Sequence, residues 1–206
     1  MKILLISPVV DINYENLKEM TIPALGLYVL EGLTPLSHKI KIIEEEIEVL
    51  DLNEECDLVG ISCMTANAPR AYELAKEFKK RGKTVIMGGV HPTIMPDEVL
   101  QYADSIIVGE AEGVWKELIK DFEQGKLKRV YNKPEPDLAE FFPINFQKMK
   151  VGIFKYIPLL TSRGCPYHCF FCSIAGIYGK KIRHLPINNI VRYIVESKTK
   201  YVFFSR

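Results

Sequence analysis

The stretch DLVGISCMTANAPRAYELAKEFKKRGKTVIMGG (57–89) decides the fold, because it holds a strand, a helix and a second strand in that order. Its two apolar runs, 57–62 and 84–89, are typical of strands that are covered on both faces. Between them, over 68–82, apolar residues recur at helical spacing, at Ala71, Leu74, Ala75 and Phe78. This order predicts two parallel strands joined by a helical crossover.

The same alternation continues on both sides of this stretch. Three more strands are expected, at 2–7, 39–43 and 105–110. Three more helices are expected, at 23–33, 96–103 and 112–125. Strands and helices that alternate in this way predict an α/β fold, with a doubly wound parallel sheet of the Rossmann or flavodoxin type over residues 1–125.

A ligand of such a sheet lies beyond the carboxyl ends of the strands, near the point where the strand order reverses. The residues that close the expected strands are Ser7, Ser62, Gly88, Gly89, Gly109 and Glu110. Glycines there let a bulky ligand approach the backbone closely. The alternative is that Gly88 and Gly89 only form a tight strand-to-helix turn. Neither GxGxxG nor GxxxxGK followed by Ser or Thr occurs, so a dinucleotide or P-loop site lacks support.

Composition and charge narrow the class of protein. The formal net charge of +1 favours neither nucleic acid nor an anionic membrane as a partner. No apolar run is long enough to form a transmembrane segment, and the start MKILLISPVV (1–10) does not read as a signal peptide. A cytoplasmic location is therefore expected, where clustered cysteines indicate metal or redox chemistry.

The second half of the chain changes character. Residues 126–155 are a predicted linker, because prolines, carboxylates and aromatic residues follow one another there without clear periodicity. A second domain, over 156–206, is expected to begin with one βαβ unit, whose strands and helix lie at 156–162, 187–199 and 201–205. Because the chain stops one residue after an apolar strand, it is expected to be truncated, or completed by a second chain.

Three of the five cysteines, Cys165, Cys169 and Cys172, lie within TSRGCPYHCFFCS (161–173), with the spacing CxxxCxxC. Thiolates suit iron–sulfur clusters, zinc or Cu(I). A structural zinc site takes four ligands, and His168 or His184 could complete one. A cubane cluster held by three thiolates would instead leave its fourth iron open to a small ligand. The adjacent Phe170 and Phe171, which could shield a cluster, favour that alternative.

The motif RGCPYHCFFC (163–172) resembles the cluster-binding motif of the radical S-adenosylmethionine superfamily, and IYGKKIRHLPINNIV (177–191) resembles the segment that follows it in the cobalamin-dependent branch. The resemblance implies that Cys165, Cys169 and Cys172 hold three irons of a 4Fe-4S cluster. The fourth iron would bind S-adenosylmethionine, which reduction cleaves to a 5′-deoxyadenosyl radical. The cysteine loop would follow the first strand of a partial (β/α) barrel.

The first half resembles the cobalamin-binding domain of the same branch, in GLYVLEGL (26–33), in residues 57–82, in VIMGGVHPT (85–93) and in IIVGEAEGVW (106–115). The resemblance implies that Ser62, Met64 and Thr65 line the channel for the nucleotide tail, and that Gly88 and Gly89 pass beneath it. The further cofactor contacts expected there are His91, Gly109 and Glu110. His91 could equally be a turn histidine bonded to backbone.

One departure concerns the ligand of cobalt. Cobalamin domains that supply a histidine to cobalt carry DxHxxG after the first strand, whereas this chain reads SPVVDINYENLKEM (7–20) there. If cobalamin binds, we expect it to bind without a protein histidine on cobalt. A degenerate domain that binds nothing is the alternative.

Simpler roles are expected for the other residues that chemistry singles out. Cys56 and Cys63 are expected to be buried small hydrophobes. Glu110 and Glu112 could favour the dipole of a helix start. Arg163 could pair with a carboxylate or the cofactor, and Arg183 and His184 could lie in a solvated basic turn. Trp115 is expected to pack a helix on the sheet.

Together these features predict part of a radical S-adenosylmethionine enzyme that uses cobalamin for methyl transfer to an unactivated carbon. A radical cyclase or rearrangement enzyme of the same branch is an alternative. So is a non-catalytic module that binds cobalamin, an iron–sulfur cluster or, with His168, zinc. A small-molecule or lipid-like substrate and an electron donor are the expected partners, and no residue is assigned a catalytic role.

Overall fold

A computed structural model of the chain describes residues 1–10, 21–138, 144–151, 155–167 and 169–205. Most of the segment in which a cobalt-ligating histidine was sought, and His168 of the zinc alternative, lie outside the described residues. Within the described part, no helix combines the length and the apolar character needed to cross a bilayer.

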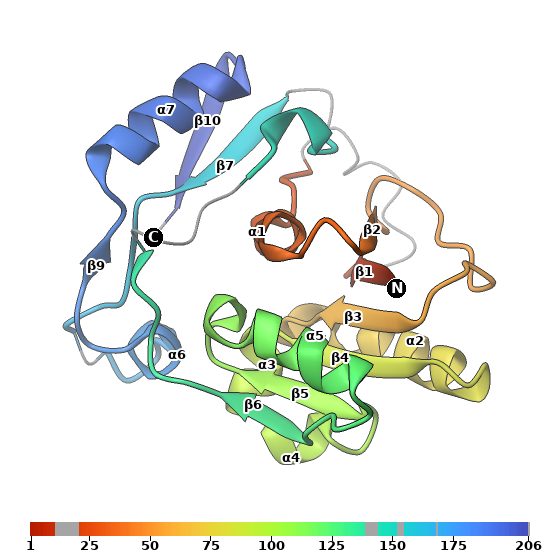
Figure 1. Cartoon of the computed structure of the whole chain (residues 1–206). Coiled ribbons are helices and arrows are strands. Elements are labelled where there is room, and N and C mark those ends of the chain that lie inside the picture. The colour runs from red at the N-terminus through yellow and green to blue at the C-terminus, as the bar shows by residue number, and fades with distance from the viewer. Residues whose placement is uncertain (11–20, 139–143, 152–154, 168, 206) are drawn as a thin grey trace.

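A six-stranded parallel sheet forms the centre of the molecule, with strand order β2-β1-β3-β4-β5-β6 (Figure 1). Its strands are β1 (Lys2–Ser7), β2 (Lys39–Glu44), β3 (Leu58–Ser62), β4 (Thr84–Gly88), β5 (Ser105–Val108) and β6 (Val130–Asn132). The order reverses at β1, which pairs with β2 on one side and with β3 on the other. The five predicted strands are confirmed within two residues. The runs of β1, β3, β4 and β5 are buried on both faces, whereas the edge strand β2 is buried only over its second half.

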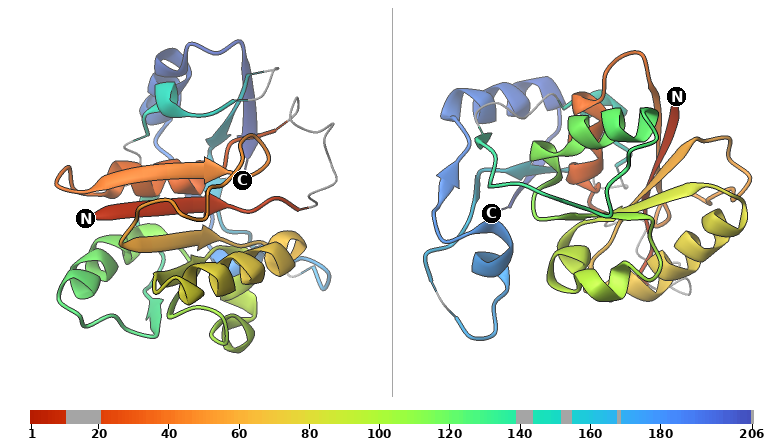
Figure 2. Two further views of the ribbon diagram at one scale, coloured as in Figure 1. Left: turned by 90° about the vertical axis from the view of Figure 1, so that its right-hand side faces the viewer. Right: turned by 60° about the horizontal axis from the view of Figure 1, so that its bottom comes forward.

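Helices cover both faces of this sheet (Figure 2). On one face, α1 (Leu25–Leu33) and α5 (Trp115–Glu123) pack in one apolar core with Leu5, Ile86 and Ile107 of the strands. On the other face, α2 (Ala68–Lys80) and α4 (Pro96–Val99) pack with Leu4, Val59 and Val85. Successive strand residues therefore point to opposite cores, as a doubly wound sheet requires. The predicted fold class is confirmed.

Three elements differ from the sequence-based prediction. The strand β6 lies inside the stretch assigned to the linker and extends the sheet through its parallel pairing with β5. Its three residues bury only Tyr131, too short a run to give a periodicity. A short helix, α3 (Val90–Ile94), was not predicted and begins directly after the Gly88–Gly89 turn. In place of the helix expected over 96–103, regular helix covers only α4, and turns follow it.

The second half forms the expected βαβ unit, in which β7 (Tyr156–Leu160) and β10 (Tyr201–Ser205) are parallel and α7 (Ile187–Ser197) connects them. Figure 2 shows this unit on the α1 side of the large sheet. Its buried residues Ile157, Leu159 and Tyr193 belong to the same apolar core as α1 and α5. A short 3-10 helix, η5 (Phe146–Lys148), contributes Phe146, whose ring lies 5.3 Å from that of Tyr193. The apolar core is therefore continuous between the two halves.

Between β7 and α7 the chain forms a long loop that carries the three clustered cysteines. Its two ends pair as a small antiparallel ladder of β8 (Ser162–Arg163) and β9 (Arg183–His184). A short helix, α6 (Ile174–Tyr178), lies within it. We call residues 164–182 the cysteine loop, and the β8–β9 ladder its neck.

Candidate cofactor site

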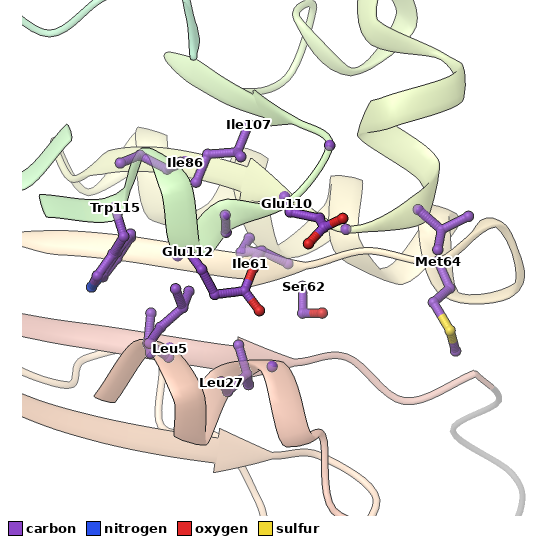
Figure 3. A pocket seen from close by; sticks show the side chains of 18 of the residues that line it. Leu5, Leu27, Ile61, Ser62, Met64, Ile86, Ile107, Glu110, Glu112 and Trp115 are labelled. Carbon is purple, nitrogen blue, oxygen red and sulfur yellow. The ribbon is translucent and has the colours of Figure 1, made fainter. Parts of the chain in front are cut away.

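A cavity of about 260 Å³ opens at the carboxyl edge of the large sheet, beneath α1 and beside α5. Figure 3 shows Leu5 and Leu27 on one side and Ile86 and Ile107 on the other, with Met64 at one end. The lining is largely apolar, as in most ligand sites. The cavity lies below the roughly 300–1,000 Å³ of typical ligand pockets. It would therefore admit one ring-sized group of a large cofactor rather than the whole molecule.

Two glycines give this cavity its shape. Gly60 lies in the middle of β3, where a Cβ atom would lie 2.8 Å from Leu5 Cδ2. Gly89 has a φ of +110°, and a Cβ there would lie 2.7 Å from the carbonyl oxygen of Cys63. Gly89 is thus required by the strand-to-helix turn itself. Both Gly88 and Gly89 also line the cavity, so the turn and ligand interpretations apply to the same pair.

Six of the eight predicted cofactor contacts line this cavity, namely Ser62, Met64, Gly88, Gly89, Gly109 and Glu110. They come together because β3, β4 and β5 are parallel neighbours whose carboxyl ends share one edge. The other two, Thr65 and His91, are not among the lining residues.

His91 is buried and is held by side chains, not by backbone as the alternative expected. Its Nδ1 lies 3.2 Å from Thr65 Oγ1, and its Nε2 lies 2.8 Å from the hydroxyl of Tyr72. That hydroxyl in turn donates to Glu98 at 2.8 Å, and burial and this carboxylate raise the pKa of Tyr72. Both ring nitrogens are therefore occupied inside the protein, which leaves His91 without a free nitrogen for a ligand.

A buried charge cluster forms the wall of the cavity nearest to the cysteine loop. Arg163 donates from Nη1 to Glu110 and from Nη2 to Glu112, each at 2.5 Å. Arg183 donates to both carboxylate oxygens of Glu110 and to the carbonyl oxygen of Pro136. Burial disfavours the charged guanidinium of Arg163, but the carboxylates of Glu112 and Glu110 outweigh burial and raise its pKa above the ordinary value.

This cluster corrects two of the simpler roles expected from sequence. The carboxylates of Glu110 and Glu112 bind arginines, so they do not serve mainly as partners of a helix dipole. Arg183 is buried in the cluster and does not lie in a solvated turn, whereas its neighbour His184 is exposed. The pairing of Arg163 with a carboxylate is confirmed.

Further residues of the cavity were not predicted. Glu112, Trp115, Arg163 and Tyr178 line it together with residues of α1. Trp115 also packs as expected, and its indole N–H donates to Thr34 at 2.8 Å. The two carboxylates two apart at the end of a strand, in GEAE (109–112), were the available signal for a polar wall.

The cysteine loop is held at its neck and exposed beyond it. Gly164 has a φ of +91°, and the carbonyl oxygen of Lys181 leaves no room for a Cβ there. The amide of Cys165 donates to the carbonyl of Gly179 at 3.0 Å. Cys165 is half-buried, whereas Cys169 and Cys172 are exposed free thiols. Within the described residues, no three Cys, His, Asp or Glu side chains converge on one metal position. Cluster ligation stays a prediction.

The aromatic shield expected around a bound cluster stays a prediction. Phe170 is fully exposed and Phe171 is 79% exposed, and the two rings contact each other edge to face at 5.3 Å. By contrast, Cys56 and Cys63 are buried, as expected for small hydrophobes. Burial raises the pKa of the Cys63 thiol to about 12, so the thiol is protonated at neutral pH.

Comparison with known proteins agrees with this geometry. Residues 20–119 match the B12 binding domain family. The chain is 36% identical over 197 residues to the bacteriochlorophyllide d C-8(2)-methyltransferase of Chlorobaculum tepidum, covering 91% of this chain and 43% of that protein. It is 40% identical over 147 residues to the C-12(1)-methyltransferase of the same organism, covering 66% and 31%. The chain thus spans less than half the length of these curated relatives.

The fold also matches a solved structure, that of the radical S-adenosylmethionine methyltransferase TsrM from Kitasatospora setae with cobalamin and a 4Fe-4S cluster bound. The TM-score is 0.71 at 15% identity, over 94% of this chain and 45% of that one, so this likeness concerns the fold alone. The family match, the relatives and the shared fold agree with the motifs of both halves. These comparisons are consistent with the cobalamin-dependent branch of the radical S-adenosylmethionine superfamily, which the motifs of both halves resemble.

Proposed function

We propose that this chain carries the cofactor sites of a radical S-adenosylmethionine methyltransferase that transfers a methyl group to an unactivated carbon. One observation carries the proposal: the cavity of the B12-binding sheet shares a wall with the neck of the loop that holds three free thiols. The named reactions of the two Chlorobaculum tepidum relatives support methyl transfer. Since the chain spans less than half of each, the activity belongs to the whole protein.

Cobalamin is the proposed ligand of this edge of the sheet, with one of its ring-sized groups in the cavity. The fit rests on an apolar lining, on the missing side chains of Gly60, Gly88 and Gly89, and on a position at the carboxyl edge beside the switch of strand order. Ser62 and Met64 would border the cofactor, while Thr65 and His91 would support that edge from outside the cavity. Both ring nitrogens of His91 contact side chains of the protein, which agrees with a cobalt that has no histidine ligand from the protein.

A 4Fe-4S cluster is the proposed occupant of the cysteine loop, held by Cys165, Cys169 and Cys172. Three free thiols within eight residues suit it, and metal sites commonly form only when the metal binds. When bound and reduced, a cluster with an open iron supplies the electron that cleaves S-adenosylmethionine. The chain's own contribution is to fix both ends of the loop through the neck. A reducing cytoplasm, proposed here as the location, would keep these thiols free.

The proposed division of the chain follows the sequence analysis. Residues 1–125 would form the cobalamin-binding part, 126–155 the linker and 156–206 the start of the radical S-adenosylmethionine barrel. We add β6 to the first part because it completes the large sheet.

Anaerobic reconstitution with iron and sulfide tests the cluster. We expect about four irons per chain and a broad visible absorbance band, as for a cysteine-ligated cluster. One tightly bound zinc and no iron would contradict the proposal.

Gel filtration with hydroxocobalamin tests the cobalamin site. The added hydroxocobalamin should remain with the protein, and a colourless protein peak would contradict the cobalamin assignment.

A further inference from the structure

The neck of the cysteine loop brings two positive charges together. Arg163 and Arg183 are direct cross-strand partners in the β8–β9 ladder. Like charges that lie directly opposite each other in an antiparallel pair repel. The pairing of the two strands therefore needs an anion that both guanidinium groups can share.

Glu110 provides that anion from the opposite half of the molecule. It follows β5 in the large sheet, 53 residues before Arg163 and 73 before Arg183. One of its carboxylate oxygens, Oε2, accepts from Nη1 of Arg163 at 2.5 Å and from Nη1 of Arg183 at 3.2 Å, and Oε1 accepts from Nη2 of Arg183. A single carboxylate thus bridges both strands of the neck and ties them to the sheet.

The burial of these groups makes the arrangement specific. The side chains of Glu110 and Glu112 are 3% and 7% exposed, and those of Arg163 and Arg183 are 13% and 12% exposed. Charges removed from water are tolerated only when they are closely paired. Arg163 and Arg183 face the two buried carboxylates, and the more exposed Glu135 also lies 3.7 Å from Arg183. Glu110 and Glu112 therefore keep their buried charges paired only while the neck is seated on the sheet. Displacing the loop would leave buried charges without partners.

The same residues border the proposed cobalamin cavity. Glu110 and Glu112 line it from the sheet, and Arg163 and Tyr178 line it from the neck and from α6 in the cysteine loop. One wall of the cavity is therefore built by the loop that would bind the cluster. A cluster that orders the cysteine loop would therefore also order this wall of the cavity. A ligand in the cavity would in turn contact Glu110 and Arg163, which hold the neck of the loop.

We propose that Glu110 is a positioning residue that latches the neck of the cysteine loop onto the B12-binding sheet and thereby couples the two cofactor sites. The inference rests on the proposed function. It adds that a cluster bound at the loop strengthens cobalamin binding in the cavity, and that cobalamin strengthens cluster binding by the same factor, because equilibrium coupling is reciprocal.

The test compares the dissociation constant for hydroxocobalamin in the chain without iron and in the anaerobically reconstituted chain. In the wild-type chain we expect reconstitution to tighten binding by a factor within the range of roughly 5–150 that is typical of coupled sites. In Glu110→Gln, which removes the shared charge at constant shape, the factor should fall toward one. Glu110→Asp keeps the charge and should restore part of it.

Glu117→Gln is the matched control, because Glu117 pairs with Lys128 and Lys133 on the outer surface of α5. It should keep the wild-type coupling factor. If Glu110→Gln does not fold, the same coupling factor is measured in Arg183→Gln. This variant removes one cation of the neck and leaves Arg163 paired with two carboxylates. It too should lower the coupling factor.

Hydrogen exchange in the iron-free chain measures the latch without any cofactor. The amides of Cys165 and Leu185, which bond to carbonyls across the loop ends, should exchange faster in Glu110→Gln, while the amides of β3 should not change. A wild-type coupling factor in Glu110→Gln, or unchanged exchange at the neck, overturns the latch.

Different results would overturn the coupling between the two sites and the proposed function itself. Equal hydroxocobalamin affinity with and without the cluster in the wild-type chain overturns the coupling and leaves the proposed function standing. A wild-type chain that takes up neither iron nor hydroxocobalamin overturns the proposed function, and the coupling with it.

Discussion

The two cofactor regions of this chain are built in opposite ways. The cavity at the sheet edge is walled by buried strands and helices, so its shape exists before anything binds. The cysteine loop is fixed only at its neck, and beyond it Cys169, Cys172 and both phenylalanines are exposed. Packing therefore shapes the proposed cobalamin site in advance, whereas the proposed cluster site would gain its order from the bound cluster. Substitutions should affect the two regions in separable ways.

The cysteines of the loop give the largest expected effect. Replacing Cys169 by Ala should abolish retention of the cluster, lowering iron from about four per chain to nearly none, because a three-thiolate site has no spare ligand. The melting temperature of the iron-free chain should not change, since Cys169 is exposed. Cys56→Ala is the control and should retain full iron. An iron content unaffected by Cys169→Ala would contradict the ligand assignment.

A substitution of Gly89 tests whether the sheet-edge cavity is shaped by packing before a ligand binds. We expect Gly89→Ala to lower the free energy of unfolding by roughly 1–3 kcal/mol, because an alanine must adopt a φ of +110°. Urea denaturation of the iron-free chain measures this loss. Gly26→Ala in α1 is the control, because a Cβ there meets nothing within 4 Å. A stability of Gly89→Ala equal to the wild type would show that the turn is not rigid.

Gly60 separates ligand binding from stability. A Cβ at this position would meet only the flexible end of Leu5, so Gly60→Ala should leave the fold intact while narrowing the cavity. We expect hydroxocobalamin affinity to fall about tenfold, or about 1.4 kcal/mol. Iron content should be unchanged. Wild-type hydroxocobalamin affinity in this variant would place the cofactor elsewhere.

The buried thiol of Cys63 gives an effect that is absent at neutral pH and appears only at alkaline pH. Its pKa is raised from 9.0 to about 12, chiefly by burial. Because the folded pKa lies above the unfolded value, its contribution to stability is fully present below pH 9 and is lost as the pH rises toward 12. At pH 10 the loss amounts to about 1.4 kcal/mol. Urea denaturation should show that the free energy of unfolding falls by this amount between pH 8 and pH 10. In Cys63→Ala the part of the fall that comes from the thiol should be absent. The same fall in Cys63→Ala would contradict the assignment.

Sequence alone predicted the sheet well and the links between the two halves poorly. Continuous apolar runs gave five of the six large-sheet strands, and only β6 was too short to leave a pattern. Strand ends brought Ser62, Gly88 and Glu110 to one edge because parallel neighbours share it. The latch could not be predicted, because Glu110 and its arginines are more than 50 residues apart and their pairing depends on how the halves pack. The contact of His91 with Tyr72 was also missed, because it joins α3 to α2 within the first half by side chains 19 residues apart.

The most direct test of the central claim is the cobalt and iron content of one sample of the chain. It would be reconstituted anaerobically, mixed with hydroxocobalamin and passed through gel filtration. We predict one cobalt and about four irons per chain in the same protein peak. A peak that carries zinc in place of iron, or iron without cobalt, would contradict a chain that holds both cofactors.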